Sequence, residues 1–429
     1  MNMPLLCALG TGLSVFAATP TVSNVTLSQN ANTRVVTVNY SLDGAAVVTL
    51  DIQTNSAANV WVTIGASNFR TLAGDVNKYV AKDAGTIEWR PNLDWPDRKI
   101  DAGGVRAVVT AWALDNLPDY MVVDLAENSA NRILYYSCEE AIPGGVMSDV
   151  YRTTSLLMKR VRARGVPFVR GSATEPGRSA SNEKPFYVVN DHDYYLGVFE
   201  LTQSQWQLVY GSNPSRLTKE GAMRPVETVS IASIRENSSN AASSGFLSEP
   251  ASGSYMGKLR ALTKVDQFAE VGIDFDLPTE SEWEFAAEGG HGAGYWNDGS
   301  PILVSSGEDT NLNCLARYNL NMATPGKTDS SNTVGPEDCT AICGTYKRND
   351  YGFYDMHGNV SEYCRDRWIA DPSALGGSLN TTGTEGVRRG GSWYHGKPQD
   401  LRSSARLSRA VTTSTAYEGF RVGCTAGLR

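Results

Sequence analysis

The stretch that decides the fold lies near the end of the chain, over residues 388–424, and reads RRGGSWYHGKPQDLRSSARLSRAVTTSTAYEGFRVGC. Each end combines glycine with an aromatic residue, in GGSW at residues 390–393 and in GF at residues 419–420. Glycine permits tight turns and close backbone approach, and the aromatic ring can anchor each end in a core. The residues between follow neither a helical nor a strand period, which predicts a displayed loop on a rigid scaffold. An ordinary surface loop between two buried strands would give the same pattern, so both interpretations stay open here.

The composition is that of a globular protein with more than one domain. A chain of 429 residues is too long for one typical core and predicts two or three domains. Its 38 Lys and Arg against 46 Asp and Glu give a net charge of −8, and no basic run is present. This balance argues against nucleic acid as a partner. The 41 glycines and 18 prolines favour turns and loops over long helices.

The beginning of the chain carries the signal of an exported protein. Residues 5–16 form an apolar run that ends in small residues at Ala17 and Ala18, which predicts a signal peptide over residues 1–18. The run is too short to span a bilayer, so no transmembrane segment is predicted. No Lys or Arg precedes it, which is a departure from the usual pattern. We expect a periplasmic, cell-surface or extracellular location.

The cysteines extend this expectation. Cleavage of the leader would remove Cys7 and leave six of the seven cysteines, an even number that predicts disulfides in an exported chain. Cys339 and Cys343 are close enough in sequence to clip a loop. A zinc site is not expected, because the four histidines are scattered along the chain: His192, His291, His357 and His395.

Residues 20–125 predict an all-β domain. Apolar residues alternate through residues 35–42 and again through residues 48–52, and the Asp43-Gly44 turn between them predicts a hairpin. Further β runs follow at residues 61–64, 86–89 and 105–114. This spacing is typical of an antiparallel sandwich of the immunoglobulin or fibronectin type, here with a spacer or presenting role. Residues 126–165 predict a connector with a strand over residues 132–136 and a short helix through residues 155–162.

Residues 166–429 carry two predicted helices and a family resemblance. Thr202 and Thr279 are good N-caps for helices over residues 203–209 and 280–287. The phrases YYLGVFELTQSQW, RPVETVS, FDLPTESEWEFAAEGG, YGFYDMHGNVSEYCRDRW, RRGGSW and EGFRVGC occur in the order of the sulfatase-modifying-factor family, which the formylglycine-generating enzyme typifies. The chain resembles this family over residues 166–424. The resemblance implies a C-type-lectin-like α+β domain, low in regular structure, whose site lies on the loop before the final strand.

The segment DMHGNVSE, residues 355–362, is a candidate calcium site. Asp355 and Glu362 offer carboxylates, and Gly358 and Val360 offer backbone carbonyls, which are the oxygen ligands that calcium prefers. The matching positions bind calcium in members of the family, so the resemblance implies a structural calcium ion. A carboxylate-capped turn without metal is the alternative.

The family's oxidase chemistry is not supported by the corresponding loop. The resemblance implies two cysteines that bind copper(I) soon after the GGSW strand, because soft sulfur ligands suit a soft metal. The segment YHGKPQDLR, residues 394–402, has no cysteine, which argues against copper. His395 and Asp400 on one loop do not supply a nucleophile and a base, and the iron-binding histidine cluster of the sulfoxide-forming relatives is absent. The sequence favours a non-catalytic protein, with a sulfatase-modifying-factor-type enzyme as the alternative.

The same loop is a candidate binding site for a protein or a glycan. It offers an aromatic face with mixed donors and acceptors, as paratopes do, from Tyr394, His395, Lys397, Gln399 and Asp400, with Tyr417 and Glu418 expected at the opposite rim. The loop region also contains four arginines: Arg402, Arg406, Arg409 and Arg421. They could bind an anion or pair with buried carboxylates or carbonyls, and pairing is favoured at least for Arg402 and Arg421. Proteins of this fold also serve as variable products of diversity-generating retroelements, diversified between GGSW and GFR. The resemblance therefore includes a variable, ligand-displaying protein.

Overall fold

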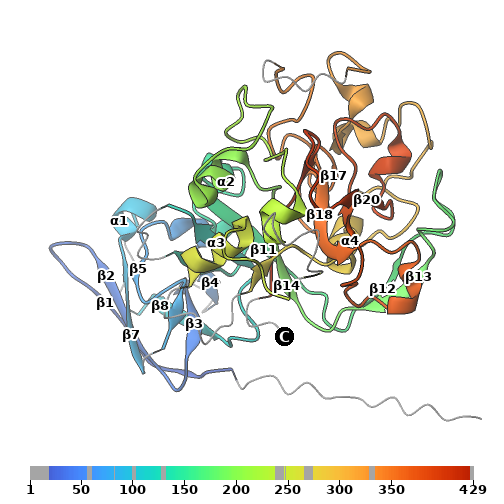
Figure 1. Ribbon diagram of the computed structural model, residues 1–429. Coiled ribbons are helices and arrows are strands. Elements are labelled where there is room, and N and C mark those ends of the chain that lie inside the picture. The colour runs from blue at the N-terminus through green and yellow to red at the C-terminus, as the bar shows by residue number, and fades with distance from the viewer. Residues whose placement is uncertain are drawn as a thin grey trace, which may run out of the picture.

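The computed structural model describes residues 19–55, 60–81, 83–98, 103–126, 132–236, 246, 248–264, 274–327 and 334–425. The predicted signal peptide and Cys7 lie outside these residues. The described part is rich in β-structure, with short helices and long loops in its C-terminal half (Figure 1).

Two antiparallel sheets fill residues 22–112, and their inner side chains form one core. The first sheet has the order β1 (Val22–Gln29), β2 (Val36–Leu42), β7 (Ala84–Trp89), β5 (Ala73–Gly74). The second has β4 (Trp61–Thr63), β3 (Ala46–Asn55) and β6 (Tyr79–Val80), with β8 (Val105–Trp112) paired to β3. The short helix α1 (Pro91–Asp94) follows β7. The alternation predicted for residues 35–42 is confirmed, whereas the immunoglobulin or fibronectin type stays a prediction.

The hairpin predicted at Asp43-Gly44 is wrong. Strand β2 pairs with β1 and β7, whereas β3 pairs with β4, β6 and β8, so the turn carries the chain from one sheet to the other. The alternating pattern shows only that each strand buries one face, and both sheets of a sandwich meet that condition.

A six-stranded sheet links the middle of the chain to its end. Its order is β10 (Ile133–Tyr136), β9 (Tyr120–Asp124), β11 (Ser155–Val161), β14 (Tyr194–Gly197), β22 (Gly423–Cys424), β15 (Phe275–Asp276). The helix predicted through residues 155–162 is therefore wrong, because these residues form β11. Both of its faces are buried, and a short apolar run buried on both faces has no period that separates strand from helix. The strand predicted over residues 132–136 is confirmed as β10.

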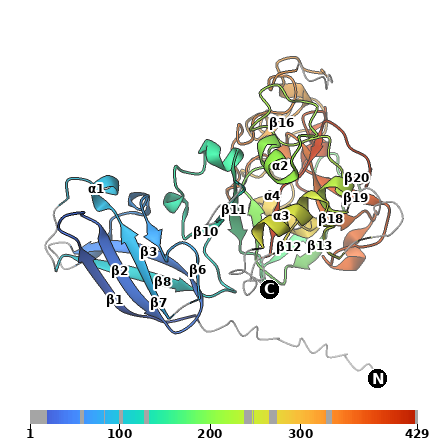
Figure 2. The same cartoon turned by 60° about the vertical axis from the view of Figure 1, so that its left-hand side comes forward.

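In the described residues of the C-terminal half, three helices and several small sheets lie to one side of β10 and β11 (Figure 2). The helices are α2 (Gln203–Tyr210), α3 (Tyr255–Thr263) and α4 (Glu280–Glu288). One four-stranded sheet has the order β20 (Leu407–Ala410), β19 (Glu385–Arg389), β18 (Ser361–Arg367), β21 (Glu418–Gly419). Two-stranded sheets pair β12 (Pro167–Arg170) with β13 (Phe186–Val189) and β16 (Ala316–Arg317) with β17 (His357–Gly358). The predicted caps are confirmed, since Thr202 and Thr279 each form a capping box.

The cysteine prediction is not borne out by the structure. No disulfide joins the six described cysteines, and Cys339 and Cys343 are buried separately, with Cys339 beside Arg224 and Cys343 beside Glu200. An even number of cysteines is compatible with disulfides but does not place any two sulfur atoms together. Among the described residues, the structure contains no helix with the length and apolar character that a membrane crossing requires.

Candidate functional site

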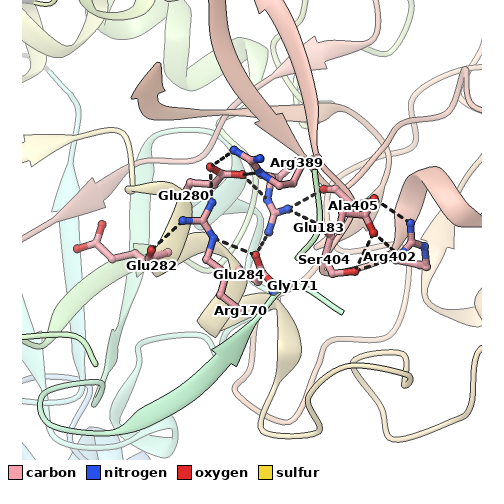
Figure 3. A network of polar contacts seen from close by, with 12 residues as sticks. Arg170, Gly171, Glu183, Glu280, Glu282, Glu284, Arg389, Arg402, Ser404 and Ala405 are labelled. Carbon is pink, nitrogen blue, oxygen red and sulfur yellow. Dashed lines mark hydrogen bonds and ion pairs between the residues drawn. The ribbon is translucent and has the colours of Figure 1, made fainter. Parts of the chain in front are cut away.

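A buried network of arginines and glutamates supports the loop that precedes the final strand (Figure 3). Glu280 and Glu284 extend from α4 toward Arg170 of β12 and Arg389 of β19, and Arg406 donates to Glu280 at 2.6 Å. All five side chains are buried. Burial raises the pKa of Glu280, but the guanidinium groups of Arg170, Arg406 and Arg389 outweigh burial and hold it well below its usual range.

Arg402 fixes the near end of the same loop. It donates to Glu183 at 2.8 Å and to Glu175 at 2.5 Å, and the Ser404 hydroxyl lies 3.0 Å from the same guanidinium. Further along, Arg421 pairs with Glu362 and Arg409 with Glu418. All four arginines that offered an anion site are therefore paired with carboxylates. The favoured interpretation of Arg402 and Arg421 as structural partners is confirmed.

Two tyrosines from opposite ends of the loop stack on each other. The Tyr394 and Tyr417 rings lie 4.7 Å apart between centroids at an interplanar angle of 18°. His395 meets Tyr417 edge-on at 6.3 Å, and Arg409 donates to the Tyr417 hydroxyl at 3.1 Å. We call these four residues, Tyr394, His395, Arg409 and Tyr417, the aromatic platform. Tyr394 is 41% exposed, so the platform reaches solvent.

Two contacts from neighbouring residues, Trp393 and Ser392, hold the platform in place. Trp393 is fully buried, and its indole donates to the Ala416 carbonyl at 2.9 Å, which joins the two ends of the loop. The Ser392 hydroxyl lies 2.8 Å from His395 Nδ1. Burial, together with the nearby Arg388 and Arg409 charges, lowers the pKa of His395 to about 4, so the imidazole is neutral at pH 7.

The remaining predicted binding residues divide into two groups. Lys397 is exposed, while Gln399 and Asp400 are half-buried in the 3-10 turn Pro398–Leu401, with the Gln399 side chain beside Gly177. Glu418 differs from the rim position expected for it, because it is fully buried. Its carboxylate accepts hydrogen bonds from Arg388, Arg409 and the Tyr363 hydroxyl. The parallel pairing of β21 with β18 draws Glu418 inward, and nothing in its local sequence predicts that pairing.

The four predicted calcium ligands are not equally available. Asp355 accepts from the Gly344 N–H at 2.7 Å, and its other carboxylate oxygen has no hydrogen-bond partner in the described part of the chain. Glu362 is fully engaged, since Arg421 donates to it at 2.7 Å and the Trp283 indole at 2.6 Å. Gly358 has φ 74°, a backbone conformation that favours glycine. Asp355 therefore fits a cation, whereas Glu362 already has a cationic partner.

Glu200 is a buried carboxylate that the sequence analysis did not consider. It accepts from the Val360 N–H at 3.0 Å and from the Asn359 side chain at 2.5 Å. Burial raises its pKa well above the usual range, and the Asp355 and Glu362 charges raise it further. Burial likewise raises the pKa of Asp355 to about 6. The sequence feature that could have indicated this burial is that Glu200 is the one acidic residue in the apolar run GVFEL, residues 197–201.

Residues 153–426 match the family described as the sulfatase-modifying factor enzyme 1-like domain, which is more than half of the chain. The chain belongs to this family. It is 29% identical over 238 residues to "Chaperone protein LppX" of Paenibacillus barcinonensis, covering 52% of this chain and 77% of that protein. It is 32% identical over 154 residues to the formylglycine-generating enzyme of Thermomonospora curvata, covering 34% of this chain but only 48% of the enzyme.

A solved structure also aligns with this chain. The structure described as Treponema denticola variable protein 1 aligns at 23% identity with a TM-score of 0.44, covering 63% of this chain and 96% of that one. In the present chain, segment 394–402 contributes Tyr394 and His395 to the aromatic platform and contains no cysteine. The sulfatase-modifying-factor scaffold here thus carries aromatic side chains where the resemblance implied copper ligands.

The ion pair between Arg421 and Glu362 predicts a large loss of stability when it is broken. Arg421→Met leaves the Glu362 carboxylate buried beside Trp283 without a cation, which should lower the free energy of unfolding by about 3–5 kcal/mol. Urea unfolding measures the change. The matched control is Arg162→Met, because Arg162 pairs with Asp119 at the surface and its side chain is 56% exposed; that loss should stay below about 1 kcal/mol. Equal losses in both variants would contradict the assignment.

The half-buried setting of His395, close to Arg388 and Arg409, predicts an unusual titration. Because its folded pKa is lowered to about 4, His395 should stay neutral from pH 8 down to about pH 5, and its ring signals in NMR should shift only below that. The contribution of His395 to stability should therefore fall as pH drops below about 6.5, where the unfolded histidine gains a proton first. His192 is the internal control, since its pKa is raised: burial opposes the shift and the Glu282 carboxylate outweighs it. A His395 midpoint near 6.5 would show that the ring is solvated.

Proposed function

We propose that this protein is an exported ligand-binding protein that presents the aromatic platform on a sulfatase-modifying-factor scaffold, without the family's copper chemistry. The stacked pair of Tyr394 and Tyr417 carries this proposal, because it joins the two ends of the loop into one surface that reaches solvent. The apolar run at residues 5–16 supports export. The family match over residues 153–426 supports the scaffold on which the proposal rests.

Preorganisation suits the platform to binding. The Trp393 indole, the Ser392–His395 contact and the Arg409–Glu418 pair hold its members before a ligand arrives. A ligand then loses less affinity to the ordering of the loop. Tyrosine offers contact area with few rotatable bonds and a hydroxyl for hydrogen bonding, which suits a protein or a glycan surface. Lys397 adds an exposed charge to the same loop.

The binding proposal predicts that affinity depends on the two tyrosines. A peptide library displayed on phage is panned against the immobilised full chain, and the recovered clones are tested on variants. Tyr394→Ala or Tyr417→Ala should weaken binding by about tenfold or more, which is about 1.4 kcal/mol. Tyr187→Ala is the matched control, because Tyr187 is 78% exposed on β13 outside the platform. Clones that bind all three variants equally would contradict the proposal, and copper(I)-dependent oxygen consumption with a cysteine-containing peptide would favour the enzyme alternative.

We further propose that the loop is a variable region of the kind that diversity-generating retroelements produce. The structure separates its positions into exposed and buried sets, with Tyr394, Lys397, Thr412 and Ser414 exposed or largely so. Loop sequences from sibling strains test this. Differences should gather at those positions and spare buried partners such as Arg402, Arg406 and Glu418. An invariant loop would instead indicate one fixed ligand or substrate.

A structural cation at Asp355 completes the proposal. The unpartnered oxygen of Asp355 supports it, and calcium is the ion that the family resemblance implies. A bound divalent cation would neutralise the buried carboxylates and stiffen the turn through residues 355–362. The Asp355 carboxylate and the nearby Glu200 carboxylate would hold it, since Glu362 is engaged by Arg421.

The cation predicts a melting temperature that depends on metal. Removal of metal by EDTA should lower the melting temperature of the full chain by several degrees, because an ion bound only by the folded state stabilises it. Excess calcium should restore it if calcium is the ion. Asp355→Asn should melt at the same temperature with and without EDTA. An EDTA-independent wild type, or an unchanged EDTA response in Asp355→Asn, would count against the site.

A further inference from the structure

A thiol lies among the buried carboxylates beneath the loop. One ligand atom each from Glu200, Cys343 and Asp355 lies within 4.8 Å of the others. Glu200 and Cys343 are fully buried, and Asp355 is 2% exposed. Glu200 follows β14, whereas Cys343 and Asp355 both lie in the long connection between β16 and β17. The fold itself therefore brings them together.

Asp355 supplies a second and independent sign of a ligand. One of its oxygens accepts from Gly344, and the other has no hydrogen-bond partner among the described residues although it is buried. A buried carboxylate oxygen without a partner costs free energy that a bound cation would recover. Among the described residues, Arg421 is the one cation hydrogen-bonded to the carboxylates of Glu200, Asp355 and Glu362, and it serves Glu362. Glu200 and Asp355 have no such partner.

The distance between sulfur and oxygen fits two ligands of one small ion. Cys343 Sγ lies 3.6 Å from Glu200 Oε2. Two tetrahedral ligands of zinc, one sulfur and one oxygen, are separated by about 3.5 Å when their bonds are about 2.3 and 2.0 Å long. The same distance suits a hydrogen bond from a neutral thiol to the carboxylate, so the experiment has to separate these two states.

We propose that Glu200, Cys343 and Asp355 hold one divalent transition-metal ion of the zinc type, rather than calcium. The inference rests on the cation proposed above and names its chemical class. Calcium takes oxygen ligands, whereas a thiolate favours zinc and related ions. On binding, the Cys343 thiol gives up its proton to solvent and the sulfur forms the metal bond, and a proton held by the Glu200 carboxyl is released to solvent in the same way. The site is structural, because its ligands are buried and join the segment after β14 to the connection before β17.

Cobalt(II) is the probe, because a cobalt–thiolate bond has a charge-transfer absorption in the near ultraviolet. The full chain is stripped with EDTA, dialysed and titrated with cobalt(II), and metal content is measured by mass spectrometry. We expect about one ion per chain, the thiolate band, and loss of the band on addition of zinc. Cys343→Ser should lose the band and Asp355→Asn should weaken cobalt binding by tenfold or more. Cys314→Ser is the matched control and should keep both, since Cys314 is exposed and outside the cluster.

The outcomes separate this inference from the proposal on which it rests. If calcium alone restores the melting temperature after EDTA and cobalt gives no thiolate band, the cation stands and the zinc-type site is wrong. If neither EDTA nor any added ion changes the melting temperature and no metal remains bound, both are wrong. The band of the wild-type protein decides the question even if Cys343→Ser does not fold. A band that persists in Cys343→Ser but disappears in Cys314→Ser would overturn the assignment of the sulfur ligand.

Discussion

The buried pair of Arg421 and Glu362 is the interaction on which the C-terminal half depends. A charge removed from water is costly unless a partner of opposite sign and further hydrogen bonds compensate it. Here Arg421 stands just before the final strand β22, Glu362 lies in β18, and the Trp283 indole of α4 completes the carboxylate's hydrogen bonds. One polar contact thus joins a helix, a strand and the end of the chain, in a region where regular pairing is short.

Glu280 and Glu284 of α4 are likewise buried and paired with arginines from other segments. Strands such as β17, β21 and β22 are two residues long, so ladder hydrogen bonds alone contribute little to holding them in place. Buried guanidinium groups bridge several segments at once, because each offers five donors in a fixed plane. Arg402 and Arg406 apply the same device to the loop. The platform is therefore carried by long-range ion pairs rather than by the backbone on either side of it.

Local patterns predicted much of this fold, and long-range pairing explains the misses. The helix caps at Thr202 and Thr279 could be predicted because each threonine bonds within its own helix, so the local sequence contains all of the residues involved. The exposed tyrosine Tyr394 and the paired Arg402 and Arg421 also followed from motif and composition. By contrast, β11, the destination of the turn at Asp43-Gly44 and the burial of Glu418 each depend on a partner far along the chain. The role of Glu200 could not be predicted for the same reason, since Asp355 and Cys343 are far from it in sequence and lie beside it only in the folded chain.

The stack between Tyr394 and Tyr417 has a consequence for how such a surface can evolve. The two rings touch, so the effect of replacing one depends on what occupies the other. Changes at the two ends of the loop are then epistatic, and their joint effect on affinity differs from the sum of the single effects. A substitution at one tyrosine would therefore change the effect on affinity of any later substitution at the other. If the loop is diversified as proposed, the set of workable sequences consists of compatible pairs at Tyr394 and Tyr417 and is smaller than the product of the two positions taken separately.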